Sequence, residues 1–103
     1  MAQITRGWAV DTRRAGQFLV TPGVLDALGG DPAALRPLLA RHLAGDWGNV
    51  DPEDAGLNDR ALRTGARLLS VYRVADEVVW IITEAADDDG RRAATTVLLA
   101  SEY

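Results

Sequence analysis

The residue with the clearest capacity for chemistry is the single histidine of this chain, His42. It lies in the run "RHLAGDWGNVDPED", four residues before Asp46. On a helical wheel, His42 falls near the middle of an apolar arc of leucines between positions 35 and 43. A buried imidazole oriented by a carboxylate can act as a general acid or base. The same placement also fits a core histidine that only packs, and this structural interpretation is the one we favour.

A second group of polar residues occupies positions where apolar ones are expected. Asp54 and Asn58 fall in the inward sector of a predicted helix, and buried polar groups must find partners. Ser70 and Tyr72 share one face of a predicted strand. These side chains predict a polar cluster around the "GDWG" turn that either fixes the turn or lines a pocket. The predicted binding or polar cluster consists of His42, Asp46, Trp47, Asp54, Asn58, Ser70, Tyr72 and Trp80.

A catalytic alternative uses an overlapping set of residues. Helices before an antiparallel meander resemble the small ribonuclease folds of the barnase-like and RelE-like type. A metal-independent ribonuclease or toxin of that architecture would use His42 and Glu84 as acid and base. An arginine, Arg67 or Arg73, would stabilise the transition-state charge, and a strand threonine would hold a phosphate oxygen. The catalytic candidates are His42, Arg67, Thr83, Glu84 and Thr95.

Metal and cofactor chemistry find little support in the sequence. The chain has one histidine and no cysteine, and it contains no HExxH spacing. The acidic residues of "DDDG" are consecutive, whereas the ligands of an EF-hand loop alternate. We therefore expect no metal and no cofactor. In the loop after Glu84, we expect Arg91 and Arg92 to pair with residues 87–89.

Composition limits the remaining classes of function. The chain has 103 residues and ordinary globular composition, which predicts one domain. Its net charge of −4 argues against nucleic acid as the main ligand. No apolar run is long enough to span a membrane, and the N-terminus lacks the apolar region of a signal peptide. We expect a cytoplasmic protein.

The elements that position these residues form a helical part followed by a strand part. Thr21-Pro22, Asp31-Pro32 and Asp51-Pro52 each place a capping oxygen before a proline, and glycines at 29–30, 45 and 65 mark the helix ends. Pro37 should kink or delay the second helix. Residues 4–10 and 17–20 fit short strands. The fold class is α+β: an N-terminal strand segment and three short helices pack on a three-stranded antiparallel β-meander.

The expected organisation is a single domain with an N-terminal extension at residues 1–15, a mainly helical part at 16–66 and a meander at 67–103. The meander has strands "RLLSVYRV", "VVWIITE" and "TTVLLA", with the second strand in the centre. This central strand is apolar on both faces. We expect the helices to cover one face, and the N-terminal segment or a partner subunit to cover the other.

Several runs together resemble a known family. "TPGVLDAL", "RHLAGDWGNVDPEDAGLNDRAL", "GARLLSVY", "VWIITEA", "TTVLL" and the terminal "EY" are similar to a family of small bacterial proteins that are encountered on plasmids and other mobile or accessory DNA. The resemblance covers residues 16–103. Two departures stand out: the loop "AADDDGRRAA" is longer than usual, and "AS" replaces a proline before the terminal Glu-Tyr. The family brings no established activity, so the resemblance implies a setting and a fold more than a reaction.

We favour a non-enzymatic protein-binding or regulatory module, acting on a host protein or in anti-defence, over the ribonuclease alternative. Three tryptophans are many for a chain of 103 residues, and tryptophan is a common interface anchor. They could equally fill a small core. A protein partner is expected, and the two-sided central strand makes a homodimer reasonable.

Overall fold

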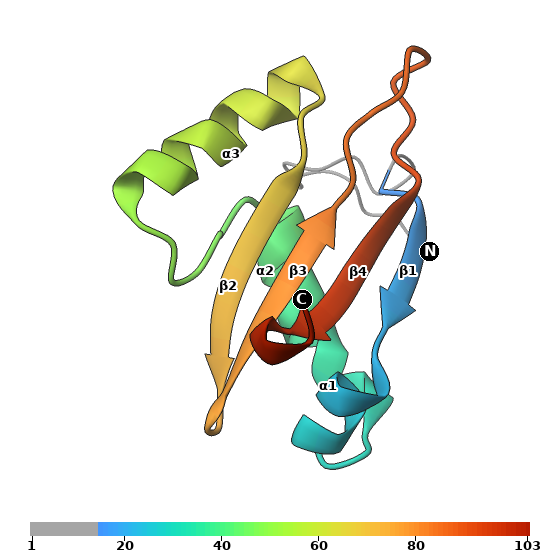
Figure 1. The fold of residues 1–103 in the computed structure, drawn as a ribbon, viewed down its shortest axis with the longest axis vertical. Coiled ribbons are helices and arrows are strands. Elements are labelled where there is room, and N and C mark those ends of the chain that lie inside the picture. The colour runs from blue at the N-terminus through green and yellow to red at the C-terminus, as the bar shows by residue number, and fades with distance from the viewer. Residues whose placement is uncertain (1–14) are drawn as a thin grey trace.

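In the part of the chain that the structure describes, the central sheet has four strands in the order β1-β4-β3-β2. The computed structural model describes residues 15–103 (Figure 1). The elements in chain order are β1 (Gln17–Val20), α1 (Pro22–Ala27), η2 (Pro32–Ala34), α2 (Leu35–Leu43), α3 (Pro52–Thr64), β2 (Leu68–Val74), β3 (Glu77–Thr83), β4 (Ala94–Leu99) and η3 (Ala100–Glu102). The class is α+β, as predicted.

The position of β1 corrects the prediction of a three-stranded antiparallel sheet. The strands β2, β3 and β4 do form the antiparallel meander, but β1 adds to β4 as a fourth, parallel strand. The backbone N–H groups of Gln17 and Thr21 donate to Ala93 O and Val97 O, both at 3.1 Å. Strand propensity in "QFLV" indicates a strand but carries no information about its neighbour, so the sequence could not reveal this pairing. The other predicted strand, residues 4–10, and Trp8 lie outside the described residues.

The helix starts follow the capping pattern of the sequence. Thr21 accepts from the N–H of Val24 at 3.3 Å, and Asp51 accepts from that of Asp54 at 2.9 Å. The second helix is delayed, because Pro32 opens only a 3-10 turn and α2 begins at Leu35. Its Pro37 therefore lies in the first turn, where the missing N–H breaks no helical bond.

The helices cover the two sides of the sheet unequally. In Figure 1, α2 lies behind the sheet, α1 lies at its lower end, α3 runs beside the outer strand β2, and η3 lies in front. The larger core lies between the sheet, α1 and α2, and it consists of Val24, Leu38, Tyr72, Val79, Ile81 and Val97. A second cluster joins α3 and the end of α2 to the sheet, and its buried members are Ala15, Leu43, Trp47, Ala61 and Leu68.

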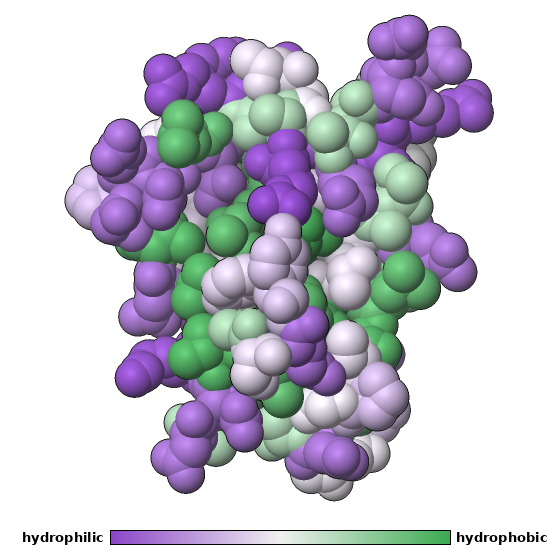
Figure 2. Space-filling model, viewed as in Figure 1, coloured by the Kyte–Doolittle hydropathy of each residue, from purple (hydrophilic) through white to green (hydrophobic). Residues whose placement is uncertain are grey.

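The front face of the sheet is apolar but less completely covered. On β3, Val79 and Ile81 are fully buried on the α2 side, whereas Val78 and Trp80 on the front are only partly buried. Figure 2 shows this front face, where hydrophobic side chains lie among hydrophilic ones. Tyr103 packs on Trp80 there, with ring centroids 5.1 Å apart. Within residues 15–103, no helix has the length and hydrophobicity needed to cross a bilayer.

Candidate functional site

The imidazole of His42 is held between two strands by both of its nitrogens. Helix α2 carries His42 toward the sheet, where Nδ1 lies 2.6 Å from Ser70 Oγ on β2. Nε2 lies 2.8 Å from Thr83 Oγ1 at the end of β3. His42 therefore lies at the centre of a polar cluster, and its hydrogen-bond partners come from the sheet.

The hydrogen bonds continue from β3 across β4. Thr83 Oγ1 lies 2.9 Å from Thr95 Oγ1, and Thr95 Oγ1 donates to the backbone oxygen of Ala15 at 2.8 Å. The sheet register explains this row, because Thr83 and Thr95 are directly paired and Ser70 points to the same face of the sheet. We call Ser70, His42, Thr83 and Thr95 the polar row.

Only one arrangement of protons satisfies the whole polar row. The carbonyl of Ala15 can only accept, so the hydroxyl of Thr95 donates to that carbonyl and accepts from Thr83. Thr83 must then accept from Nε2–H of His42. A neutral imidazole has one donor, so Nδ1 accepts from the hydroxyl of Ser70. The geometry thus assigns the Nε2–H tautomer to His42.

Burial keeps this imidazole neutral. All four side chains of the polar row have an exposed fraction of 0%. Burial, and then the positive charge of Arg92, lower the pKa of His42 to about 4. At neutral pH the ring is therefore uncharged and fully bonded, and in this conformation it cannot touch a dissolved substrate.

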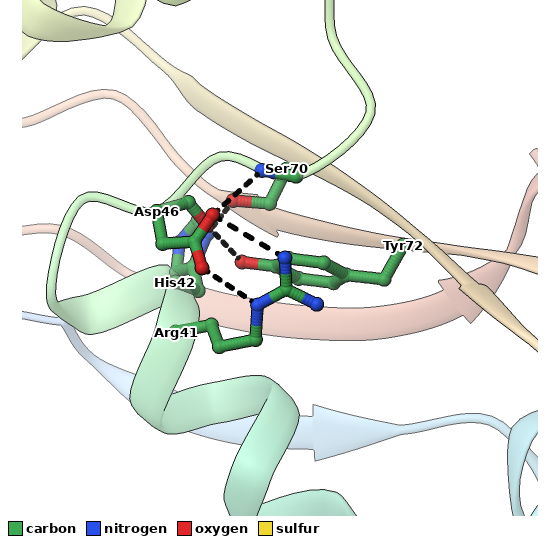
Figure 3. Close-up of polar contacts among 6 residues, drawn as sticks. Arg41, His42, Asp46, Ser70 and Tyr72 are labelled. Atoms are coloured by element: carbon green, nitrogen blue, oxygen red, sulfur yellow. Dashed lines mark hydrogen bonds and ion pairs between the residues drawn. The ribbon is translucent and has the colours of Figure 1, made fainter.

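The expectation that Asp46 orients His42 is wrong. Its carboxylate accepts from Arg41 Nε at 2.7 Å and Nη2 at 3.3 Å, and from the N–H of Gly48 at 3.2 Å (Figure 3). The bond from Arg41 is the main cause that lowers the pKa of Asp46. Asp46 follows the C-terminus of α2, and there its side chain faces solvent whereas the ring of His42 faces the sheet.

Tyr72 links this ion pair to the core. Its hydroxyl donates to the backbone oxygen of Asp46 at 2.6 Å, and the guanidinium of Arg41 lies 4.5 Å from the centre of its ring. Burial raises the pKa of Tyr72 to about 12, so the hydroxyl stays protonated and remains a donor. The interaction fixes the "GDWG" turn against β2.

Trp47 fills the joint between helices and sheet. It is buried, meets the His42 ring edge-on with centroids 5.7 Å apart, and donates from Nε1 to Asp59 at 3.0 Å. The prediction that Asp54 belongs to the same cluster is wrong. Asp54 is exposed in the first turn of α3, where its backbone N–H donates to the cap Asp51.

Asn58 is buried as predicted, but its partner is the edge of the sheet. Its Nδ2 donates to Leu69 O at 2.8 Å, and its Oδ1 accepts from Leu69 N–H at 3.2 Å. The side-chain amide therefore bonds the outer edge of β2 as a neighbouring strand would. The sequence indicates that Asn58 is buried but does not indicate a backbone partner.

The "GDWG" turn bonds the next position of the same edge. Val71 N–H donates to Trp47 O at 3.0 Å, and Asn49 N–H donates to Val71 O at 2.6 Å. Gly48 lies between them with φ +75, where a Cβ would come within 2.1 Å of Val71 O. Only glycine allows the turn to approach β2 this closely. Residues 47–49 and Asn58 thus cover the β2 edge.

The other catalytic candidates do not join His42. Thr83 and Thr95 are in the polar row, but Arg67 lies at the surface, where Nη1 donates to Tyr103 Oη at 3.1 Å. Glu84 is exposed and, by strand alternation after Thr83, points to the front face. Trp80 also points to the front, away from the cluster in which it was predicted. No open cleft lined by the five candidates is formed.

Arg92 has a structural role that sequence analysis missed. It donates to the backbone oxygens of Ala61 at 3.1 Å, Ala66 at 2.8 Å and Glu84 at 3.0 Å. The expected pairing of Arg92 with the acidic residues of its own loop is therefore wrong. Asp87 accepts from backbone N–H groups of the loop instead. The sequence could not tell which of two adjacent arginines would reach the end of α3.

Within the described part of the chain, no three His, Cys, Asp or Glu residues are grouped as a metal site. Comparison of the chain with protein-family models, with curated proteins and with solved structures found no match. The assignment of a function therefore rests on the residues themselves.

Proposed function

We propose that this chain is a non-enzymatic protein-binding or regulatory module. The observation that carries the proposal is the burial of the polar row, whose four side chains are fully enclosed and satisfied by one another. The residues best suited to chemistry are thereby used to join α2 to three strands. What the described residues offer to a partner is apolar side chains on a rigid sheet.

Exposed apolar side chains on β1 support binding. Phe18 and Leu19 lie together there, whereas the other large exposed apolar side chains of the described residues, Leu57 on α3 and Tyr103 after η3, lie on other elements. Phe18 and Leu19 are neighbours on β1, with exposed fractions of 47% and 43%, at the end of the strand order. Apolar side chains on a sheet edge favour association with another polypeptide over a small polar ligand.

The setting of this function is proposed from the family resemblance alone. Similar proteins of mobile or accessory DNA suggest a bacterial cytoplasmic protein that acts on a host protein, in regulation or against defence. A homodimer is compatible with this role, because an oligomer can present two copies of the same surface.

Site-specific photo-crosslinking in bacterial cells tests the proposal. A benzophenone amino acid at position 19 should yield a covalent adduct with a second polypeptide, either this chain or another. The same amino acid at position 57, also exposed but on α3, serves as the matched control. Equal yields at the two positions would contradict the proposal.

A parallel RNA-cleavage assay tests the ribonuclease alternative. The wild-type chain should cleave no more RNA than a buffer control does. Cleavage that is lost in a folded His42→Gln variant would overturn the non-enzymatic assignment.

A further inference from the structure

The outer edge of β1 presents unused backbone groups. In a parallel pair, alternate residues of a strand bond to the neighbour. Gln17 and Thr21 donate to β4, so the N–H and C=O groups of Phe18 and Val20 point away from it. Within residues 15–103, no element lies beyond β1 on that side (Figure 1).

The apolar side chains of β1 are exposed on both faces of the sheet. Phe18 pairs with Thr95 and shares the α2 face, whereas Leu19 pairs with Thr96 and shares the front face. A partner that docked on one face would cover only one of them. A strand added to the edge would cover both, because its own side chains alternate in the same way.

β1 carries neither a charge nor a proline, two features that keep edge strands from pairing. Its sequence is "QFLV", and its four residues make it a short edge. Two copies can therefore approach edge to edge without repulsion between like charges. At the opposite edge, Asn58 and residues 47–49 already bond β2.

We infer that the β1 edge binds the β1 edge of a second copy of this chain, as an antiparallel pair about a two-fold axis at Leu19. The inference rests on the proposed binding function and names its partner. Phe18 of each copy would exchange backbone hydrogen bonds with Val20 of the partner subunit, because both residues point outward. Phe18 would then contact that valine on one face, and the two copies of Leu19 would meet on the other.

This register makes the pairing self-complementary. Each exposed apolar side chain of β1 gains an apolar neighbour, and each outward backbone group gains a partner. The four described strands of each copy then belong to one continuous sheet across the axis. The contact is short, so we expect a dimer that dissociates readily on dilution.

Single cysteine variants test the register, because the natural chain contains no cysteine. Residues in a non-hydrogen-bonded antiparallel pair have Cα atoms about 4.5 Å apart, which a disulfide can span. Full-length Leu19→Cys should therefore oxidise to a covalent dimer at least about tenfold faster than Leu57→Cys, whose thiol would be exposed on α3. Equal rates would overturn the inference. Faster crosslinking through Phe18→Cys would overturn this register.

Sedimentation equilibrium of the full chain gives the second test. Leu19→Lys places two ammonium groups on the axis and should raise the dimer dissociation constant at least about tenfold, whereas Leu57→Lys should leave it unchanged. A wild-type chain that stays monomeric at all concentrations would overturn the second copy as partner. The proposed binding function would still stand if position 19 captured a different protein in cells.

Discussion

The two edges of the sheet differ in whether their outward backbone groups are hydrogen-bonded. At the β2 edge, Asn58 bonds both backbone groups of Leu69, and the "GDWG" turn bonds Val71. At the β1 edge, within the described residues, Phe18 and Leu19 are exposed and the outward backbone groups meet no other element. Edge strands invite pairing unless they are covered or charged. The difference fits the proposal that the β2 edge serves stability and the β1 edge serves association.

The largest expected effect on stability concerns the polar row, which lies apart from both edges of the sheet. His42→Ala removes a fully buried ring and leaves Ser70 and Thr83 without their partner, so the free energy of unfolding should fall by about 4 kcal/mol. Urea denaturation measures this loss. Arg36→Ala, at an exposed position of the same helix, is the control and should change it little. A loss below about 1 kcal/mol would contradict a structural role.

Acid should weaken the polar row in a defined pH range. The pKa of His42 is lowered from 6.5 to about 4, so the unfolded chain binds a proton more readily than the folded one. The contribution of His42 to the free energy of unfolding is complete above pH 6.5 and falls as the pH drops toward 4. The loss from this group is on the order of 3 kcal/mol. The difference in unfolding free energy between wild type and His42→Gln, followed against pH, isolates the effect from the carboxylates. A constant difference would show that His42 does not titrate in this way.

A smaller effect should follow from opening the covered edge. Asn58→Ala removes two hydrogen bonds to Leu69, which should cost about 2 kcal/mol of unfolding free energy. It would also leave the β2 edge open at this position, so we expect new concentration-dependent association by light scattering. Leu57→Ala, the neighbouring exposed position, is the control. If Asn58→Ala is no less stable and no more associated than Leu57→Ala, the edge-covering role of Asn58 is wrong.

The smallest expected effect comes from a substitution in the β2–β3 turn, which should leave both edges of the sheet unchanged. Ala75 has φ 54, a left-handed conformation that disfavours a Cβ. Ala75→Gly should therefore raise the free energy of unfolding by about 0.5 kcal/mol, the relief of strain exceeding the added freedom of the unfolded chain. Thermal denaturation measures the gain. Asp76→Gly, at the other turn residue, should give no such gain.

The helices and strands could be predicted from the sequence better than the pairing of the strands with one another. The capped helix starts and the meander follow local patterns, so they could be predicted without any long-range information. The parallel pairing of β1 with β4 joins residues about 77 positions apart, as between Gln17 and Ala94. Local propensity does not specify such a contact.

The polar cluster shows the same limit at the level of side chains. The helical wheel placed His42 on the buried face, and strand alternation placed Ser70 and Tyr72 together. Closeness along the chain suggested Asp46 as the partner of His42, whereas the actual partners come from the sheet. Proximity in sequence is a poor guide to the partner of a side chain that leaves its own helix.

Amide hydrogen exchange along β1 tests the account most directly. The N–H groups of Phe18 and Val20 point outward, whereas that of Leu19 faces β4 by alternation. We predict that protection at 18 and 20 rises with protein concentration, and that protection at 19 does not change. Protection at 18 and 20 that is independent of concentration, or the absence of protection at all concentrations, would contradict the pairing of two copies through β1.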